Sequence, residues 1–200
     1  YRYDDDLADY KLSDIIIDDD GNPVDNDTIS ASDLIRRRWL DNDFYGFTWS
    51  VNYDKRDLNL IVGGAWNRYE GNHFGEVIWT QAGGAEFEER YYFNTGDKRD
   101  YNSYVKANYQ LTDRLNVFAD LQYRRIDYVV AGTENNLNDV SVDARFDFFN
   151  PKGGLTFSLT DNSQLYGSWA VANREPVRDD FLDFEGNNPQ PEKLNNLEFG

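Results

Sequence analysis

The chain of 200 residues contains no cysteine and no methionine. Without cysteine, neither a disulfide framework nor a thiolate metal site can form. Methionine is missing even at position 1, so we expect a processed or excised piece whose signal peptide cannot be inspected. The sequence also lacks an apolar run of about 18 residues, which excludes a transmembrane helix. It does not exclude a membrane β-barrel, whose alternating strands score poorly on hydropathy.

Basic residues are scarce, with 20 Lys and Arg against 37 Asp and Glu, for a formal net charge of −17. Because phosphate binding needs a basic surface, we expect no nucleic-acid partner. The mean hydropathy is −0.78, yet aromatic residues make up 16% of the chain. That aromatic content is too high for a disordered acidic chain and predicts a folded one.

Large apolar side chains alternate with small or polar ones over residues 45–53, which read YGFTWSVNY. Successive side chains of a β-strand point to opposite faces, so the apolar ones share one face. Similar alternation recurs along the chain, and no convincing helical stripe is present. The pattern predicts an all-β fold of about eight strands, at roughly 1–13, 34–54, 58–69, 88–110, 115–129, 142–159, 164–173 and 193–200.

The predicted connections alternate between short and long. Tight polar turns suited to hairpins are expected at 54–57, 112–114 and 160–163. Segments rich in Asp, Asn, Gly and Glu predict long loops at 14–33, 67–97, 129–143 and 173–191. Antiparallel up-and-down outer-membrane barrels have this arrangement, with short periplasmic turns and long extracellular loops.

Alternation is also typical of a soluble β-sandwich, so alternation alone does not distinguish a sandwich from a membrane barrel. The spacing of the aromatic residues helps to distinguish them. Tyr45 and Tyr53 lie eight residues apart on one face, as do Tyr101 and Tyr109. Eight residues rise roughly 27 Å, or about 21 Å after strand tilt, close to the apolar band of an outer-membrane barrel. We therefore favour a transmembrane barrel. Its predicted lipid-facing residues are Tyr45, Phe47, Trp49, Val51, Tyr53, Tyr101, Val105, Tyr109, Leu121 and Tyr123.

Five segments together resemble the TonB-dependent receptors of the Gram-negative outer membrane, in a consistent order over nearly the whole chain. The last two resemble a stretch common in that family, an Arg-Pro-containing loop followed by Pro-Glu and a strand ending Glu-x-Gly. The segments are Asp33–Gly46 (DLIRRRWLDNDFYG), Tyr69–Trp79 (YEGNHFGEVIW), Phe148–Leu155 (FFNPKGGL), Val171–Phe181 (VANREPVRDDF) and Pro189–Gly200 (PQPEKLNNLEFG).

The resemblance implies a 22-stranded barrel closed by an N-terminal plug domain. It implies uptake of a scarce nutrient such as a ferric siderophore, haem, cobalamin or a glycan, with energy delivered through TonB. Neither a plug nor a TonB box is recognisable, so we expect residues 1–200 to be part of one barrel domain. The implied partners are outer-membrane lipid and lipopolysaccharide, the TonB complex through the plug, and a small-molecule or metal-chelate ligand. No cofactor is expected.

Four residues are candidate ligand contacts: His73, Trp79, Arg174 and Arg178. The only histidine, His73, could touch an iron complex, but one imidazole with no second His or Cys is a poor transition-metal site. We therefore expect it to pack or to form hydrogen bonds, and we expect no metal site. Arg174 and Arg178 lie where a strand enters a long loop and could hold an anion, or Arg174 could pair with Asp179 or Asp180.

Three charged residues, Lys106, Asp120 and Arg124, have apolar neighbours of opposite parity. On the lipid face a mid-membrane Arg or Lys costs about 2–4 kcal/mol, so they should face the lumen or plug. Catalysis finds little support, because a nucleophile would depend on His73 in a loop. The alternatives are a soluble secreted β-rich adhesin or carbohydrate-binding module and, third, a passive porin.

Overall fold

The computed structural model of the protein describes residues 3–6, 15–16, 28–29, 31–81, 88–183 and 189–200. Nearly all of the regular structure in these ranges is β-strand. The elements are β1 (Tyr3–Asp6), β2 (Ile15–Ile16), β3 (Thr28–Ile29), β4 (Ala31–Lys55), β5 (Leu58–Thr80), β6 (Glu89–Thr112), β7 (Leu115–Gly132), β8 (Val142–Thr160), β9 (Ser163–Arg174), α1 (Arg178–Asp183) and β10 (Glu192–Phe199).

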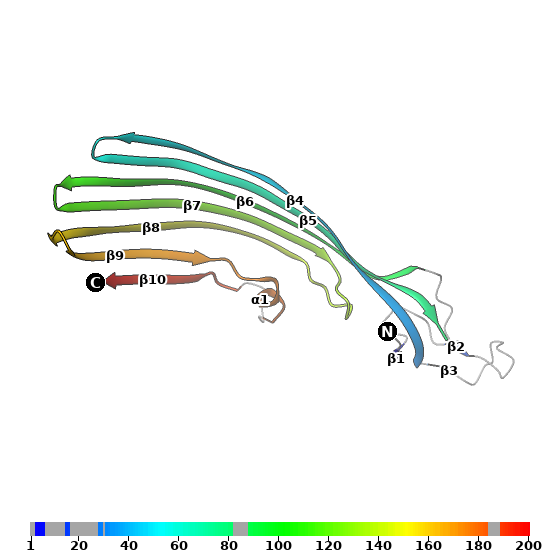
Figure 1. Ribbon diagram of the computed structural model, residues 1–200. Helices are drawn as coiled ribbons and strands as arrows, with labels where there is room; N and C mark the ends of the chain where they lie inside the picture. The colour runs from blue at the N-terminus through cyan, green and yellow to red at the C-terminus, as the bar shows by residue number, and fades with distance from the viewer. Residues whose placement is uncertain (1–2, 7–14, 17–27, 30, 82–87, 184–188) are drawn as a thin grey trace. The chain divides into compact units, whose positions relative to one another are not determined.

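Eight strands form one sheet in the order β1-β4-β5-β6-β7-β8-β9-β10, and β2 pairs with β3 in a separate hairpin. From β4 onward each strand lies beside the next one along the chain (Figure 1). The register places Leu155 of β8 opposite Gly167 of β9, and Trp169 of β9 opposite Leu197 of β10, both antiparallel. The predicted all-β, up-and-down antiparallel architecture is therefore confirmed.

Three hairpin turns contain two residues each, at 56–57, 113–114 and 161–162. They lie together at one end of the strands (Figure 1). In the first turn Arg56 has a positive φ of 50°, the left-handed conformation that tight hairpins require. The short turns predicted at 54–57, 112–114 and 160–163 are confirmed.

One predicted loop was wrong. Most of 67–97 is strand, since β5 continues to Thr80 and β6 begins at Glu89. The polar composition of this segment suggested a loop, but strand propensity depends on what packs against the strand. Here Val77 of β5 and Tyr91 and Tyr92 of β6 are buried in one hydrophobic cluster, which stabilises the two strands as a pair.

The prediction was also incomplete at other connections. The helix α1 lies inside the predicted 173–191 loop and has no signature in the hydrophobic pattern, because it is only six residues long. Of the predicted strand 1–13, β1 covers Tyr3–Asp6 and the rest lies outside the described residues. The predicted 14–33 loop also lies mostly outside them. The hairpin of β2 with β3 and the start of β4 fall within that loop.

The chain divides into two compact units. Unit 1 comprises residues 1–43, 70–97 and 129–142, and unit 2 comprises residues 44–69, 98–128 and 143–200. The core of unit 1 is small: Leu34, Val77, Tyr91 and Tyr92 are buried, and Leu137 packs against them.

In unit 2 the sheet exposes large apolar side chains. All ten residues predicted to face lipid are exposed, from 41% for Tyr101 to 62% for Val51. Trp66 of β5 lies between the rings of Tyr45 and Tyr101, with centroids 5.8 and 6.3 Å away. Exposed apolar area of this extent marks an interaction surface. No helix within the described residues is long and apolar enough to cross a membrane.

Candidate functional site

A network of charged side chains lies on unit 2 around Glu175, which directly follows β9. Lys98 of β6 donates from Nζ to Glu175 Oε1 at 2.8 Å. Arg124 of β7 donates from Nη1 to Glu175 Oε2 at 3.1 Å and from Nε to Asp100 Oδ2 at 2.9 Å. The Glu175 and Asp100 side chains are only 13% and 11% exposed. Lys98 and Arg124 therefore hold Glu175, the first residue of the β9–β10 connection, against β6 and β7.

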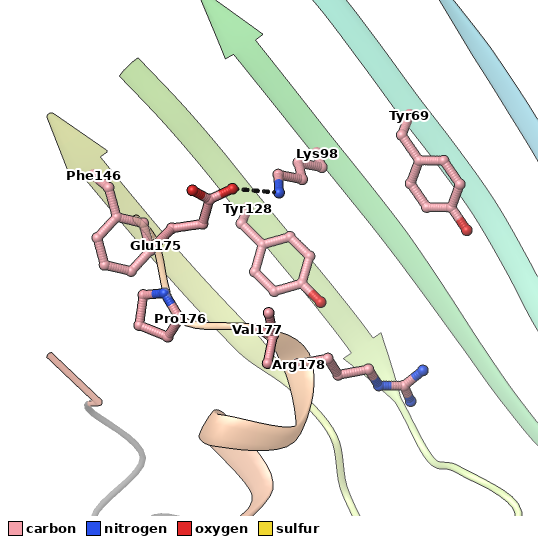
Figure 2. A pocket seen from close by; sticks show the side chains of 8 residues that line it. All are labelled: Tyr69, Lys98, Tyr128, Phe146, Glu175, Pro176, Val177 and Arg178. Carbon is pink, nitrogen blue, oxygen red and sulfur yellow. Dashed lines mark hydrogen bonds and ion pairs between the residues drawn. The ribbon is translucent and has the colours of Figure 1, made fainter. Parts of the chain in front are cut away.

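A cavity of about 230 Å³ lies beside this network. Four neighbouring strands each contribute one side chain, and the segment after β9 closes the other side (Figure 2). The cavity combines three aromatic rings with cationic Lys98 and Arg178. The lining residues are Tyr69, Lys98, Tyr128, Phe146, Glu175, Pro176, Val177 and Arg178.

The closing segment is held by local capping and by one buried ring. Asp180 Oδ2 accepts a hydrogen bond from the backbone N–H of Val177 at 2.7 Å, which satisfies a donor at the start of α1. Phe181 is 3% exposed, and its ring lies 6.1 Å from that of Tyr128. The helix is therefore anchored to the same tyrosine that lines the cavity.

The environment of Glu175 favours its charged form. Burial by itself raises the pKa of this carboxyl, but the hydrogen bond from Lys98 and the charge of Arg124 outweigh burial and hold the pKa below its ordinary value. Glu175 therefore stays ionised at neutral pH and keeps both cations in place. A ligand with an aromatic or apolar body and an anionic group matches the aromatic rings and the two cationic side chains, Lys98 and Arg178, that line the cavity.

Of the four candidate ligand contacts, Arg174 and Arg178 belong to unit 2, and only Arg178 lines the cavity beside Glu175. Arg174 donates to Glu192 Oε1 of β10 at 2.8 Å, a different carboxylate from Asp179 and Asp180, the partners considered as one alternative from the sequence. Adjacent antiparallel strands place residues 174 and 192 directly opposite each other, which explains the choice of partner.

The other two candidates belong to unit 1. His73 Nε2 lies 3.2 Å from Asn42 Oδ1, a hydrogen-bonding contact of the kind expected for this residue. Trp79 is 45% exposed and does not line the cavity beside Glu175. Within the described part of the chain, no group of three or more His, Cys, Asp or Glu residues is arranged to hold a metal ion.

The residues predicted to face the lumen form ion pairs across strands. Lys106 Nζ lies 3.8 Å from Asp120 Oδ2, and Arg124 belongs to the Glu175 network. Lys98 and Tyr128 line the cavity but were not among the residues predicted from the sequence. Both share strand parity with a predicted residue, Lys98 with Lys106 and Tyr128 with Arg124, so extending the alternation to the strand ends would have found them.

Comparison with known proteins gives one match at the level of a family. A family model described as TonB dependent receptor-like, beta-barrel, matches residues 1–200. A search of curated proteins found no match.

Proposed function

The chain belongs to the TonB-dependent receptor β-barrel family, and we propose that it binds a scarce nutrient in the cavity beside Glu175 for TonB-powered import. Members of this family are outer-membrane transport receptors of Gram-negative bacteria, not enzymes. The proposed cargo is a ferric siderophore, haem, cobalamin or a similar compound. Residues 1–200 would form part of one barrel domain, and TonB would act through a plug domain.

The observation that carries this proposal is the composition of the cavity. Tyr69, Tyr128 and Phe146 offer rings, and Arg178 offers a guanidinium that can form paired hydrogen bonds to a carboxylate or phenolate. Ligand sites typically combine apolar walls with a few placed polar groups, in cavities of about 300–1,000 Å³. The cavity of about 230 Å³ would therefore hold one part of a large ligand, with the rest contacting other extracellular loops.

The two faces of unit 2 suit a membrane-spanning sheet. We propose that the exposed stripe from Tyr45 to Tyr53 faces lipid and that lipopolysaccharide surrounds its outer end. The charged network of Lys106, Asp120 and Arg124 would then face the lumen or the plug. Support comes from the exposure of the apolar stripe and from the cross-strand pairing of the charges.

Transport is tested with the full-length receptor in its own bacterium. Cells depleted of iron or cobalamin are given radiolabelled ferric siderophores, haem and cobalamin, with and without a TonB deletion. We expect accumulation of at least one compound that requires both the receptor and TonB. Receptor-dependent uptake that persists without TonB would indicate a passive porin and refute the proposal.

The cavity itself is tested with two tyrosine substitutions. Tyr128→Ala removes a ring from the cavity wall, whereas Tyr109→Ala removes an exposed ring from a strand of the same unit outside the cavity. We expect Tyr128→Ala to weaken binding of the transported compound by at least about tenfold, as loss of a stacked aromatic contact does. Equal affinity in both variants would exclude this cavity as the ligand site.

A further inference from the structure

The carboxylate of Glu175 is bound to a cation that lines the cavity. Its Oε1 accepts a hydrogen bond from Lys98 Nζ at 2.8 Å, and both side chains belong to the cavity lining (Figure 2). The Lys98 side chain remains 36% exposed, so an ion that enters the cavity can reach it. Lys98 Nζ also lies 6.0 Å from the centre of the Tyr128 ring. Glu175 therefore holds the position beside that ring that the anionic group of a ligand would take.

The two partners of this ion pair differ in how firmly their backbones are held. Lys98 lies within β6, which pairs with β5 on one side and β7 on the other. Glu175 follows the last residue of β9, where the pairing with β10 ends at Arg174 and Glu192. Connecting segments move more readily than paired strands. Glu175 can therefore move away from Lys98 while Lys98 stays in place.

Arg124, the second cation bound by Glu175, has another carboxylate partner. Its Nε donates to Asp100 Oδ2 at 2.9 Å, and Asp100 is 8% exposed. When Glu175 moves away, Arg124 therefore keeps a buried ion pair. Within the described residues, the ion pair with Glu175 is the only one that Lys98 forms. Displacement of Glu175 thus frees one cation, Lys98, for a ligand.

Glu175 also determines which anions gain from binding in the cavity. A small inorganic anion would replace the ion pair of Glu175 with Lys98 by another ion pair of the same kind, and it would gain little. An anion carried on an aromatic body gains in addition a contact with the Tyr128 ring. Competition by Glu175 therefore selects against small anions and in favour of aromatic ones.

We propose that Glu175 is a specificity-determining residue that competes with the anionic group of the ligand for Lys98. An aromatic anion binds by displacing the Glu175 carboxylate, and an anion that cannot reach the aromatic rings is excluded. The proposal rests on the role of this cavity as the nutrient-binding site, and it adds the group that the nutrient must displace there.

The test uses the full-length receptor purified in detergent and isothermal titration calorimetry with three probes. Phenyl phosphate is an aromatic anion, inorganic phosphate is an anion without a ring, and benzyl alcohol is a ring without a charge. Glu175→Gln removes the competing charge at nearly constant size. Glu192→Gln is the matched control, because Glu192 pairs with Arg174 and does not line the cavity. Thermal unfolding verifies that each variant is folded.

We expect the wild-type receptor and Glu192→Gln to bind phenyl phosphate and to show no measurable binding of inorganic phosphate. Glu175→Gln should bind phenyl phosphate at least about fivefold more tightly and should bind inorganic phosphate measurably, because Lys98 can then pair with either anion. The affinity for benzyl alcohol should be the same in all three proteins. Lys98→Gln added to Glu175→Gln should remove the gain, because the contested cation is then absent.

Three results would overturn the proposal. They are the absence of phenyl phosphate binding, an unchanged or weaker affinity for phenyl phosphate in Glu175→Gln, and an equal gain for benzyl alcohol, which would show only a more open cavity. Uptake and probe binding fail separately. Probe binding that changes as expected without TonB-dependent uptake would support the role of Glu175 and refute nutrient import, and uptake with unchanged probe binding would do the reverse.

Discussion

Glu175→Gln should release the segment that closes the cavity. Glutamine has nearly the same size as glutamate but carries no charge, so the substitution weakens two contacts without creating a void. The contacts are those with Lys98 at 2.8 Å and with Arg124 at 3.1 Å. Residues 175–183 should then open more often, while the strands beneath them remain paired.

The size of the effect follows from the exposure of each partner. The Lys98 side chain is 36% exposed, so solvent screens its contact, and we assign it about 0.5 kcal/mol. The Arg124 side chain is 27% exposed and retains Asp100, so we assign its contact about 1.5 kcal/mol, the lower end for a charged hydrogen bond. Together these contacts predict a loss of about 2 kcal/mol in the free energy of local opening, or roughly 30-fold in the opening equilibrium.

Hydrogen exchange measured by mass spectrometry on the full-length receptor reports this equilibrium directly. Peptides covering 175–183 should exchange roughly 30-fold faster in Glu175→Gln, and strand peptides should not change. Glu192→Gln is the matched control. The side chains of Arg174 and Glu192 are 62% and 69% exposed, so their ion pair contributes little to stability. Unchanged exchange in Glu175→Gln, or an equal change in Glu192→Gln, would refute the assignment of Glu175 as the anchor of this segment.

Three further predictions concern pH, backbone conformation and the membrane. Because the pKa of Glu175 is lowered in the folded protein, the exchange difference between wild type and Glu175→Gln should be complete above the ordinary pKa of 4.5 and vanish as pH falls through the lowered value. Gly132→Val should destabilise the receptor by about 1–3 kcal/mol in urea unfolding, since φ is +116° and a Cβ would meet Phe93 O, whereas Gly153→Ala, with only an ordinary contact at 3.6 Å, should be nearly neutral. Val51 lies between the middle of the apolar stripe and its end at Tyr53, so Val51→Arg should cost about 1–3 kcal/mol when the receptor folds into lipid vesicles. Ser50→Arg on the other face should cost less, and equal losses would contradict a lipid-facing Val51.

Much of the fold could be predicted because it depends on local rules. The alternation from Tyr45 to Tyr53 identifies a strand and its apolar face without any knowledge of neighbouring strands. The two-residue turns are equally local, since their polar residues suit tight hairpins. Neither rule locates the end of a strand whose composition is polar. The extension of β5 and β6 into the predicted 67–97 loop was therefore not predicted.

The candidate sites could be predicted only in part. Arg178 was identified from a loop motif, but its companions Lys98 and Tyr128 come from other strands. For Arg174 the sequence suggested either an anion or the nearby Asp179 and Asp180, whereas strand pairing brings Glu192 opposite it. Proximity along the chain was a poor guide to ion pairing, because in a sheet the neighbours of a side chain lie on adjacent strands.

The sequence by itself determined the fold class, the apolar face of the strands and the family, because period-two alternation, turn residues and ordered motifs are properties of the chain. Tertiary structure alone decided which charges meet. Glu175 bonds to Lys98 and Arg124, which are 77 and 51 positions away, and Trp39 bonds to Glu76, 37 positions away. These contacts depend on strand register and on how the β9–β10 connection folds, and each is a geometric result of several strands pairing together.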